Sequence, residues 1–519
     1  MRFEENRGIT SRLAKVFSAE LDGIHARLIE VEVDIHAGLH AFTIVGLADK
    51  ALNEAKERVN SALKNSDVKP PNRENRRITV NLAPADIQKT GSHYDLVIAI
   101  GYLVATGQIA PFSGEKMLFV GELGLDGSVR KVPGVLNIAM LADRLKIPCL
   151  VVPYENREEA TIVSHLRVVP VKNLAELILH LEGKREIPEP VLAKKTLAPS
   201  AAPDLSEIKG QTSAKRAVTI AAAGGHNLLL SGPPGVGKSL LAKALSGILP
   251  PLIDEEALEV TSILSAAGFA PQGLVRERPV RAPHQTASLI SIIGGGSDPR
   301  PGEISLSHRG VLFLDEIPEF PRNILEALRA PLEDGEVRVA RARGTAVFPA
   351  RFSLVAAMNP CPCGFFGDPD KECTCGAYEI MRYQKKISGP LLDRIDLQVH
   401  VSRVPIAALR DSSVETASSH AARLLVGIAR DKQRLRFVGS PGKTNSLMTS
   451  QELLGIFENN PEADSFIKTL SRSLISPRGF YKLLKVARTI ADIEESEKVR
   501  QEHLAEAFSY RLKSEELRP

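Results

Sequence analysis

Residues 232–239 combine a glycine-rich turn with a lysine and a hydroxyl, a set of groups suited to binding phosphate. They match the P-loop pattern G-x-x-x-x-G-K-S/T at every defined position. Glycines let successive backbone N–H groups point at one phosphate chain, with a helix N-terminus behind them. In this pattern Lys238 reaches the β- and γ-phosphates, and the Ser239 hydroxyl binds Mg²⁺. The residues predicted to cradle ATP are Gly232, Pro233, Pro234, Gly235, Val236, Gly237, Lys238 and Ser239.

A second group of residues can supply hydrolysis. Residues 310–316 read Gly-Val-Leu-Phe-Leu-Asp-Glu, an apolar strand that ends in two carboxylates. Such a strand suits a parallel sheet whose carboxyl end faces a ligand crevice. Asp315 is predicted to hold Mg²⁺, and Glu316 to polarise the attacking water. Alone, the pattern also fits a solvated strand end, but beside a phosphate loop it predicts ATP hydrolysis.

The elements that must position these groups can be read around them. Residues 228–230 have the pattern of a buried strand, and the apolar residues from Leu240 to Leu245 have helical spacing. Strand, turn and helix therefore follow one another, as the phosphate-binding pattern requires.

Composition limits the wider possibilities. A chain of 519 residues has room for about three or four domains, each with its own core. The formal net charge is only +4, so a contact with nucleic acid must depend on local basic patches. The N-terminus lacks a secretory pattern, and no apolar run approaches the roughly 20 residues that cross a membrane. We therefore expect a cytoplasmic protein without a membrane partner, whose cysteines stay reduced.

The chain divides by pattern into four parts. Residues 1–185 alternate strand and helix signals, which predicts a separate α/β domain. Residues 186–204 are rich in proline and poor in apolar pattern, and predict an extended linker. Residues 205–400 contain the nucleotide-binding motifs and form the predicted core, whereas residues 401–519 lose their strand signals and are predicted to be helical.

Three runs of the first part carry a family resemblance. Residues 42–47 (FTIVGL), 78–86 (ITVNLAPAD) and 121–127 (GELGLDG) resemble the N-terminal domain of the YifB/ComM family of magnesium-chelatase-like AAA+ proteins. The resemblance covers nearly the whole chain. It implies an α/β fold with a Lon-protease-like (S5-like, ChlI-type) N-terminal domain, a P-loop AAA+ domain with a parallel sheet, and a helical lid that corresponds to the magnesium-chelatase C-terminal domain.

The Lon-like resemblance does not extend to proteolysis. When the Lon pattern is laid over this chain, its nucleophilic serine falls at about Asp95 and its lysine base at about Leu136. Neither residue can do that chemistry. Ser92 and Lys131 lie nearby, but a dyad needs its base within hydrogen-bond reach of the nucleophile. We therefore expect no protease activity, and a structural or DNA-contacting role for the domain.

The same resemblance implies three further catalytic residues. Asn359 ends a buried strand and resembles sensor 1, which orients the attacking water. Arg394, in residues 388–396, resembles an arginine finger supplied in trans, which implies a site shared between subunits and, by family, a homohexamer. A simple ion pair of Arg394 with Asp393 or Asp396 is the alternative. Arg478 matches sensor 2, and an ordinary surface arginine is the alternative there.

Four of the five cysteines fall within fifteen residues of one another. Disulfides are not expected in the cytosol, so the group predicts a tetrahedral, structural Zn²⁺ site with no open position. The C-x-C spacing is tighter than the usual C-x-x-C, and the fifth cysteine, Cys149, fits a small core residue. The predicted zinc ligands are Cys361, Cys363, Cys373 and Cys375.

Three segments could contact DNA. By resemblance, the long glycine-rich insertion at 260–308 projects toward the centre of a ring. Residues 336–348 predict a β-hairpin with Arg338, Arg341 and Arg343 near its tip, suited to sequence-independent contacts with phosphates or simply solvated. A third basic group is either a DNA contact or a solvated face: Lys432, Arg434 and Arg436.

The resemblance as a whole implies an ATP-hydrolysing hexameric motor that acts on branched or single-stranded DNA without sequence preference. For ComM members it implies branch migration or helicase activity during integration of transforming DNA. Two other functions stay open. A magnesium-chelatase motor subunit would drive metal insertion into a porphyrin, and a regulatory protein would use ATP only to switch conformation.

Overall fold

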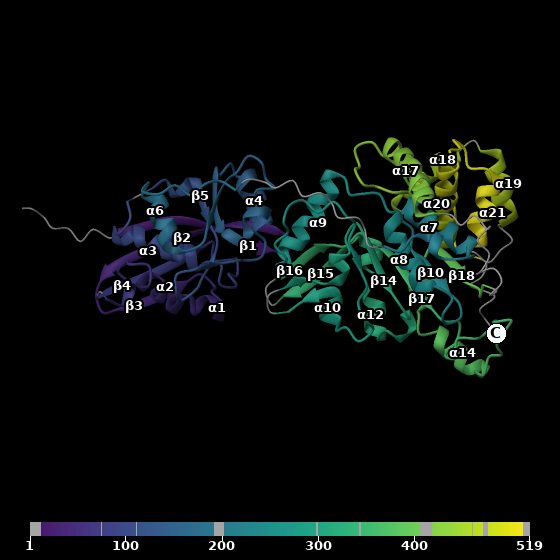
Figure 1. The fold of residues 1–519 in the computed structure, drawn as a ribbon, viewed down its shortest axis with the longest axis horizontal. Coiled ribbons are helices and arrows are strands. Elements are labelled where there is room, and N and C mark those ends of the chain that lie inside the picture. Colours follow the sequence, from purple (N-terminus) through teal and green to yellow (C-terminus); the bar gives the residue numbers. More distant parts are fainter. Residues whose placement is uncertain are drawn as a thin grey trace, which may run out of the picture. The chain divides into compact units, whose positions relative to one another are not determined.

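The computed structural model describes residues 12–73, 75–110, 112–190, 202–296, 299–341, 344–404, 418–458, 460–470 and 476–511. Arg343 and much of the expected linker lie outside these ranges. The chain forms two compact units (Figure 1). The first contains residues 1–195, 261–275 and 297–300, and the second contains residues 196–260, 276–296 and 301–519.

The first unit is built on a mixed seven-stranded sheet with the order β3-β4-β2-β1-β5-β8-β9. The long strands β1 and β2 pair antiparallel along their whole length, whereas β5, β8 and β9 are parallel neighbours. The strands of this sheet are β1 Arg12–Asp22, β2 His25–Ala37, β3 Ala41–Val45, β4 Arg76–Ala83, β5 Met117–Phe119, β8 Cys149–Pro153 and β9 Arg167–Val171. A separate two-stranded sheet pairs β6 (Glu122–Leu123) with β7 (Val129–Arg130).

Helices cover this sheet and close its core. Residues 96–103 of α3 are all buried, and a Cβ atom added at Gly101 would lie 2.7 Å from a Val33 methyl carbon. The glycine therefore lets the helix approach the sheet closely. The helices of this unit are α1 Lys50–Asn53, α2 Ala55–Lys64, α3 Asp95–Thr106, α4 Val135–Arg144, α5 Arg157–Ala160 and α6 Leu174–Leu181.

The second unit contains the predicted parallel sheet, with the order β11-β14-β17-β10-β18. Every neighbouring pair in it is parallel, so the carboxyl ends of its strands share one edge. Its three central strands, β14, β17 and β10, are completely apolar or nearly so, as expected for a sheet covered on both faces. The strands are β10 Leu228–Ser231, β11 Val280–Arg281, β14 Val311–Leu314, β17 Ser353–Met358 and β18 Leu397–His400.

A β-hairpin precedes β17, as the alternating pattern predicted. Strands β15 (Glu336–Arg341) and β16 (Gly344–Pro349) pair antiparallel with Arg338 opposite Val347. The helices of the core are α7 Thr212–Gly224, α8 Lys238–Ile248, α9 Asp254–Ala266, α10 Leu289–Ile293, α11 Glu303–Leu306, α12 Arg322–Ala327, α13 Pro331–Asp334, α14 Ala377–Gln384 and α15 Gly389–Leu392. The insertion also contains β12 (Gly294–Gly295) and β13 (Arg300–Pro301).

The C-terminal part is the predicted helical lid, and its helices lie together in Figure 1. Its apolar residues join the same core as those of α7, α8 and the sheet, so lid and sheet share one hydrophobic interior. None of the helices in the described ranges combines the length and apolarity that crossing a membrane requires. The lid helices are α17 Ser419–Arg436, α18 Ser450–Phe457, α19 Pro461–Leu470, α20 Pro477–Ile493 and α21 Gln501–Ser509.

Candidate nucleotide-binding and catalytic site

The phosphate loop connects β10 to α8 at the carboxyl edge of the sheet. Gly235 and Gly237 have φ angles of +80° and +92°, in the left-handed region that favours glycine, and a Cβ atom on either would meet open space. Gly232 is needed for another reason, because a Cβ atom there would lie 2.2 Å from the Val401 carbonyl oxygen. The loop therefore has the shape and the open side of a phosphate cradle.

Lys238 begins α8 and lies inside the loop. Its Nζ donates hydrogen bonds to the carbonyl oxygens of Gly232 and Pro233, each at 2.7 Å, and to Asn359 Oδ1 at 3.0 Å. Burial lowers the pKa of this amine to about 8. The predicted sensor 1 residue and the predicted phosphate-binding lysine are thus in direct contact, although they lie far apart in the sequence.

The two predicted magnesium ligands also meet. Ser239 Oγ donates a hydrogen bond to Asp315 Oδ2 at 2.6 Å. A hydroxyl and a carboxylate at this separation are hard oxygen donors of the kind that Mg²⁺ prefers, so the residues present fit the ion. Glu316 follows with an exposed side chain and a φ of +49°, an uncommon conformation for a residue other than glycine. Such strained residues concentrate at active sites.

Arg394 lies at the opposite edge of the sheet. It precedes β18, whose residue Leu397 is in register with Leu228 at the start of the parallel strand β10. The phosphate loop follows the end of β10, and four residues of strand span about 13 Å. The finger candidate and the phosphate loop of one chain are therefore separated by the length of a strand.

Arg394 is held by several partners. Its Nε donates to the Arg329 carbonyl oxygen at 3.0 Å and its Nη1 to that of Pro390 at 2.7 Å, while Nη2 contacts the Glu333 carboxylate. Asp396, the alternative partner considered from the sequence, instead pairs with Lys482 at 2.7 Å.

Arg478 joins the same cluster from the lid. Its Nη2 lies 3.1 Å from Glu333 Oε1. This carboxylate therefore contacts both Arg394, the predicted arginine finger, and Arg478, the predicted sensor 2. Burial works to raise the pKa of Glu333, but the charges of the two arginines lower it overall. The sequence analysis missed Glu333, because nothing in its local pattern indicates a partner 61 residues away.

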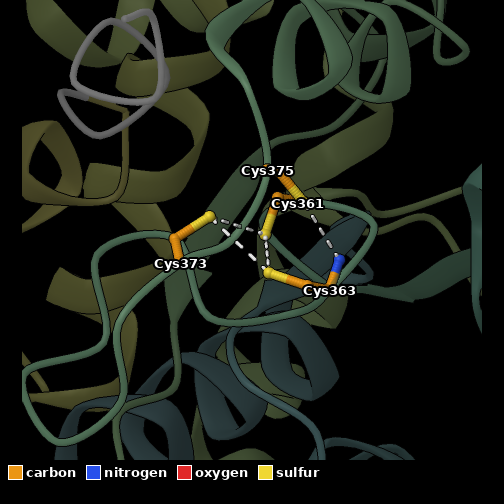
Figure 2. Close-up of side chains that lie close together, drawn as sticks. All are labelled: Cys361, Cys363, Cys373 and Cys375. Atoms are coloured by element: carbon orange, nitrogen blue, oxygen red, sulfur yellow. Dashed lines mark hydrogen bonds between the residues drawn. The ribbon is translucent and has the colours of Figure 1, made fainter.

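The four predicted zinc ligands come together (Figure 2). Their sulfur atoms all lie within 4.8 Å of one another, and Cys361 Sγ is 3.3 Å from Cys363 Sγ and 3.7 Å from Cys373 Sγ. Tetrahedral zinc with Zn–S bonds of about 2.3 Å places its sulfur atoms roughly 3.8 Å apart. The group also receives a backbone hydrogen bond, from Cys363 N to Cys375 Sγ at 3.4 Å. These thiols therefore fit a tetrahedral metal ion.

The cysteine cluster adjoins the nucleotide site. Cys361 follows Asn359 by two residues. Gly364 has a φ of +86°, and a Cβ atom there would lie 2.7 Å from Pro234 Cδ in the phosphate loop. The loop that carries the cysteines thus packs directly against the phosphate loop.

The first unit has no serine–lysine pair at the two positions compared with Lon. Asp95 is fully buried and accepts hydrogen bonds from Arg58 Nε at 2.6 Å and Arg58 Nη2 at 3.0 Å. Burial raises the pKa of this carboxyl to about 6, although Arg58 opposes the shift. Leu136 is also buried, and Ser92 donates its hydroxyl proton to Glu122 rather than to a lysine. The paired Asp95 and Arg58 are part of the core.

The basic groups expected to contact DNA have acidic neighbours. Arg338 Nε donates to Glu336 Oε1 at 2.8 Å. In the lid, Arg436 forms a bidentate pair with the buried Asp492, with distances of 2.6 and 2.8 Å. Arg434 pairs with Asp431 at 2.8 Å. Arg436 is therefore held against the lid interior by its buried partner, which the sequence could not indicate because Asp492 lies 56 residues away.

Three family models match the chain. The model described as "Magnesium chelatase, subunit ChlI" matches residues 204–409. "Subunit ChlI of Mg-chelatase" matches residues 31–156, and "Magnesium chelatase, subunit ChlI C-terminal" matches residues 416–511. With the parallel sheet, the phosphate loop and the helical lid, these matches define an AAA+-type ATPase of the magnesium-chelatase class.

Curated relatives are similar over nearly the full length. The chain is 42% identical to competence protein ComM of Haemophilus influenzae, over 96% of this chain and 97% of that protein. It is 42% identical to the protein YifB of Escherichia coli, over 94% of this chain and 95% of YifB. A magnesium-chelatase 38 kDa subunit of Cereibacter sphaeroides is 26% identical, over 60% of this chain and 92% of the subunit. The chain belongs to the ComM/YifB family of magnesium-chelatase-like AAA+ proteins.

Proposed function

We propose that this protein is an ATP-hydrolysing motor that acts on DNA as a homohexameric ring. The observation that carries the proposal is the division of the catalytic residues between two edges of one sheet. Lys238, Ser239, Asp315 and Asn359 are joined by hydrogen bonds at the carboxyl edge. Arg394 lies at the amino edge, about a strand length from the phosphate loop of its own chain, which supports a role toward the nucleotide of a neighbouring subunit.

At the carboxyl edge, each residue has a distinct role in the proposal. The loop N–H groups and the Lys238 amine bind the phosphates of ATP, and Ser239 and Asp315 hold Mg²⁺. When bound, the ion neutralises developing charge on the phosphates. Glu316 polarises the attacking water, and Asn359 orients it. Asn359 is already hydrogen-bonded to Lys238, so the water-orienting and phosphate-binding groups share one rigid arrangement.

At the amino edge, Arg394 and Arg478 act together on the nucleotide of the neighbour. Both guanidinium groups contact the same carboxylate, so both can approach one phosphate group. A guanidinium supplied in this way stabilises the charge of the transferring phosphoryl group. Head-to-tail contacts that reuse one interface close into a ring, and the resemblance supplies the number six.

The DNA part of the proposal is supported by the relationship to the competence protein ComM, which extends over 96% of this chain. We propose a helicase or branch-migration activity on branched or single-stranded DNA, without sequence preference, that assists integration of transforming DNA. The hairpin β15–β16 is one candidate contact, because Arg338 on it is exposed. In this proposal the protein works in the cytoplasm.

Four parts of the chain take separate roles in the proposal. Residues 1–185 form a Lon-like domain without proteolytic function, and residues 186–204 link it to the motor. Residues 205–400 form the ATPase core with its cysteine cluster, and residues 401–519 form the lid. Zinc in the cysteine cluster is structural, since four thiolates leave no open position. About one Zn²⁺ per chain, lost in a Cys373→Ser Cys375→Ser variant, is the expected metal content.

The test is the rate of ATP hydrolysis by the full-length protein, without DNA and with single-stranded, duplex or four-way-junction DNA. Lys238→Ala is the blank. Stimulation by branched or single-stranded DNA that fades as salt is added supports a motor that follows the DNA backbone. A rate that is the same with every DNA contradicts the proposal.

A second candidate rests on the family models, whose descriptions name magnesium chelatase. A chelatase motor would hydrolyse ATP while metal enters a porphyrin. Adding a porphyrin to the same assay, with Mg²⁺ present throughout, separates the two functions, because only a chelatase motor responds to the porphyrin. A purely ATP-switched regulatory protein is the third possibility. It would bind ATP without sustained turnover, so Glu316→Gln would leave the rate of ATP hydrolysis unchanged.

A further inference from the structure

A groove of about 520 Å³ lies beside the catalytic carboxylates and belongs to none of the sites described above. One wall is the segment that directly follows Glu316, with the 3₁₀ turn Ile317–Glu319 and the start of α12. The other wall is α14. Side chains that matter for the argument are Arg322, Tyr378, Arg382, Lys385 and Lys386. We call this feature the α14 groove.

The outer face of α14 carries an aromatic ring, a methionine and basic side chains. Its inner face packs into the core through Ile380 and Tyr383. The Tyr378 side chain is 73% exposed, which leaves an aromatic ring facing solvent. The exposed residues lie at positions i, i+3, i+4 and i+7 of one helical stripe, and are Tyr378, Met381, Arg382 and Lys385.

The groove is strongly positive. Four basic side chains line it, against the single carboxylate of Glu319. That carboxylate pairs with Lys386 at 3.1 Å. Three cations, Arg322, Arg382 and Lys385, therefore give the groove a net positive charge that the lining itself does not balance. This local field contrasts with the net charge of only +4 for the whole chain.

Cations beside an exposed aromatic ring suit single-stranded nucleic acid. Lysine and arginine follow the phosphate backbone, and an aromatic ring stacks on a base that is not already stacked in a duplex. An acidic protein surface would also satisfy the cations, but one exposed ring beside three cations matches more closely the stacking ring and positive groove of single-strand binders. The combination therefore favours single-stranded DNA over a protein partner.

Both walls lead directly to catalytic residues. Gln384 Nε2, on α14, donates a hydrogen bond to the Pro360 carbonyl oxygen at 3.0 Å. Pro360 lies between Asn359 and Cys361, the first residue of the cysteine cluster. The opposite wall begins at Pro318, two residues after Glu316. A strand in the groove would thus contact elements that position the water-polarising and water-orienting residues.

We propose that the α14 groove binds single-stranded DNA, with Arg322, Arg382 and Lys385 on phosphates and Tyr378 stacked on a base. This inference rests on the proposed function, namely that the motor acts on DNA. It adds a contact surface outside the hairpin, next to the ATPase site. The cysteine cluster ends at Cys375, two residues before α14 begins, so a bound metal would also fix one end of this surface.

The test is the affinity of the full-length protein for a fluorescent oligothymidylate, measured by anisotropy at several salt concentrations. Tyr378→Ala should weaken binding by about five- to hundredfold without changing the salt dependence, because it removes stacking. Lys385→Glu should weaken binding and lower the slope of log affinity against log salt by about 0.7 or more, because it removes a phosphate contact.

The matched control is Lys498→Glu. Lys498 is exposed in the lid, and its reversal changes the net charge by the same amount as Lys385→Glu. The control should bind the oligonucleotide like the unmodified protein, and Tyr378→Phe should do the same, because it keeps the ring. Circular dichroism and light scattering on each variant monitor folding and subunit number.

The outcomes separate the two proposals. If the unmodified protein binds no single-stranded DNA, this inference fails, and binding to a four-way junction in the same assay decides the proposed function separately. If it binds DNA and Tyr378→Ala and Lys385→Glu bind equally well, only the groove assignment fails. If the variants keep their affinity but lose subunits in light scattering, the groove is a contact between copies of the chain, which also overturns the inference.

Discussion

In the proposed mechanism, the two edges of the parallel sheet contribute different groups to ATP hydrolysis. At the carboxyl edge, Ser239 contacts Asp315 and Lys238 contacts Asn359, and the glycines leave an open side for phosphates. At the amino edge, two arginines share Glu333, and the described residues there form no glycine-rich phosphate loop. In the proposal, each chain has a nucleotide-binding edge and an arginine-bearing edge, and its own arginine lies about a strand length from its own phosphate loop.

The largest expected effect tests whether Arg394, at the amino edge, has a catalytic role. Arg394→Ala should lower kcat by about 10³-fold or more, because a guanidinium that stabilises the transferring phosphoryl group is lost. ATP affinity should change little, since the phosphate loop is intact. Steady-state turnover and nucleotide titration measure the two quantities. Arg394→Lys should remain impaired, because lysine lacks the planar fork of donors.

Glu316→Gln tests the carboxyl edge in the same way. Loss of the carboxylate that polarises water should lower kcat by about 10²- to 10³-fold. ATP binding, measured with a fluorescent nucleotide, should persist, because the Lys238, Ser239 and Asp315 contacts remain. Unchanged turnover would remove Glu316 from the catalytic site.

The pH dependence of ATP binding tests the role of Lys238 at the carboxyl edge. Burial lowers the pKa of Lys238 to about 8, so raising the pH above this value removes the proton from the free protein. ATP favours the protonated amine, and its affinity at pH 9 should be up to about tenfold weaker than at pH 7. Calorimetry at both values measures the change. Lys238→Ala should bind ATP weakly at both pH values. If ATP binding by this variant depends on pH as strongly as in the unmodified protein, the assignment of the pH dependence to Lys238 is contradicted.

Glu333→Gln should have the smallest effect. The two guanidinium groups lose the charge that holds them together and repel each other, so kcat should fall by about three- to tenfold with KM nearly unchanged. In the Arg478→Ala background the same substitution should cost less, because only one arginine remains to be positioned. Asp334→Asn, at the next residue, is the control and should leave kcat unchanged.

The sequence predicted the contents of the carboxyl edge well, because each motif is contiguous and follows a strand. The parallel order of β10, β14 and β17 then places the motifs side by side. The grouping of the four cysteine thiols was also predictable, since these cysteines lie close in the chain. In both cases local spacing carries the chemical information.

Contacts that depend on distant partners were not predictable. Glu333 bridges Arg394 and Arg478 only because α13, the segment before β18 and the lid converge in the fold. The role of Arg436 could not be decided from the sequence for the same reason, because its partner Asp492 lies 56 residues away. The sequence does contain one sign of the α14 groove, namely the helical spacing of Tyr378 and its basic neighbours. The groove itself could not be predicted, because its second wall comes from another part of the chain.

The most direct measurement mixes two inactive proteins. Lys238→Ala subunits keep Arg394, and Arg394→Ala subunits keep an intact phosphate loop. When the two are co-expressed in equal amounts, random assembly gives about one interface in four an intact loop and an intact arginine. We predict recovery of about a quarter of the normal ATP turnover by the same argument. A mixture as inactive as either parent would contradict an active site shared between subunits.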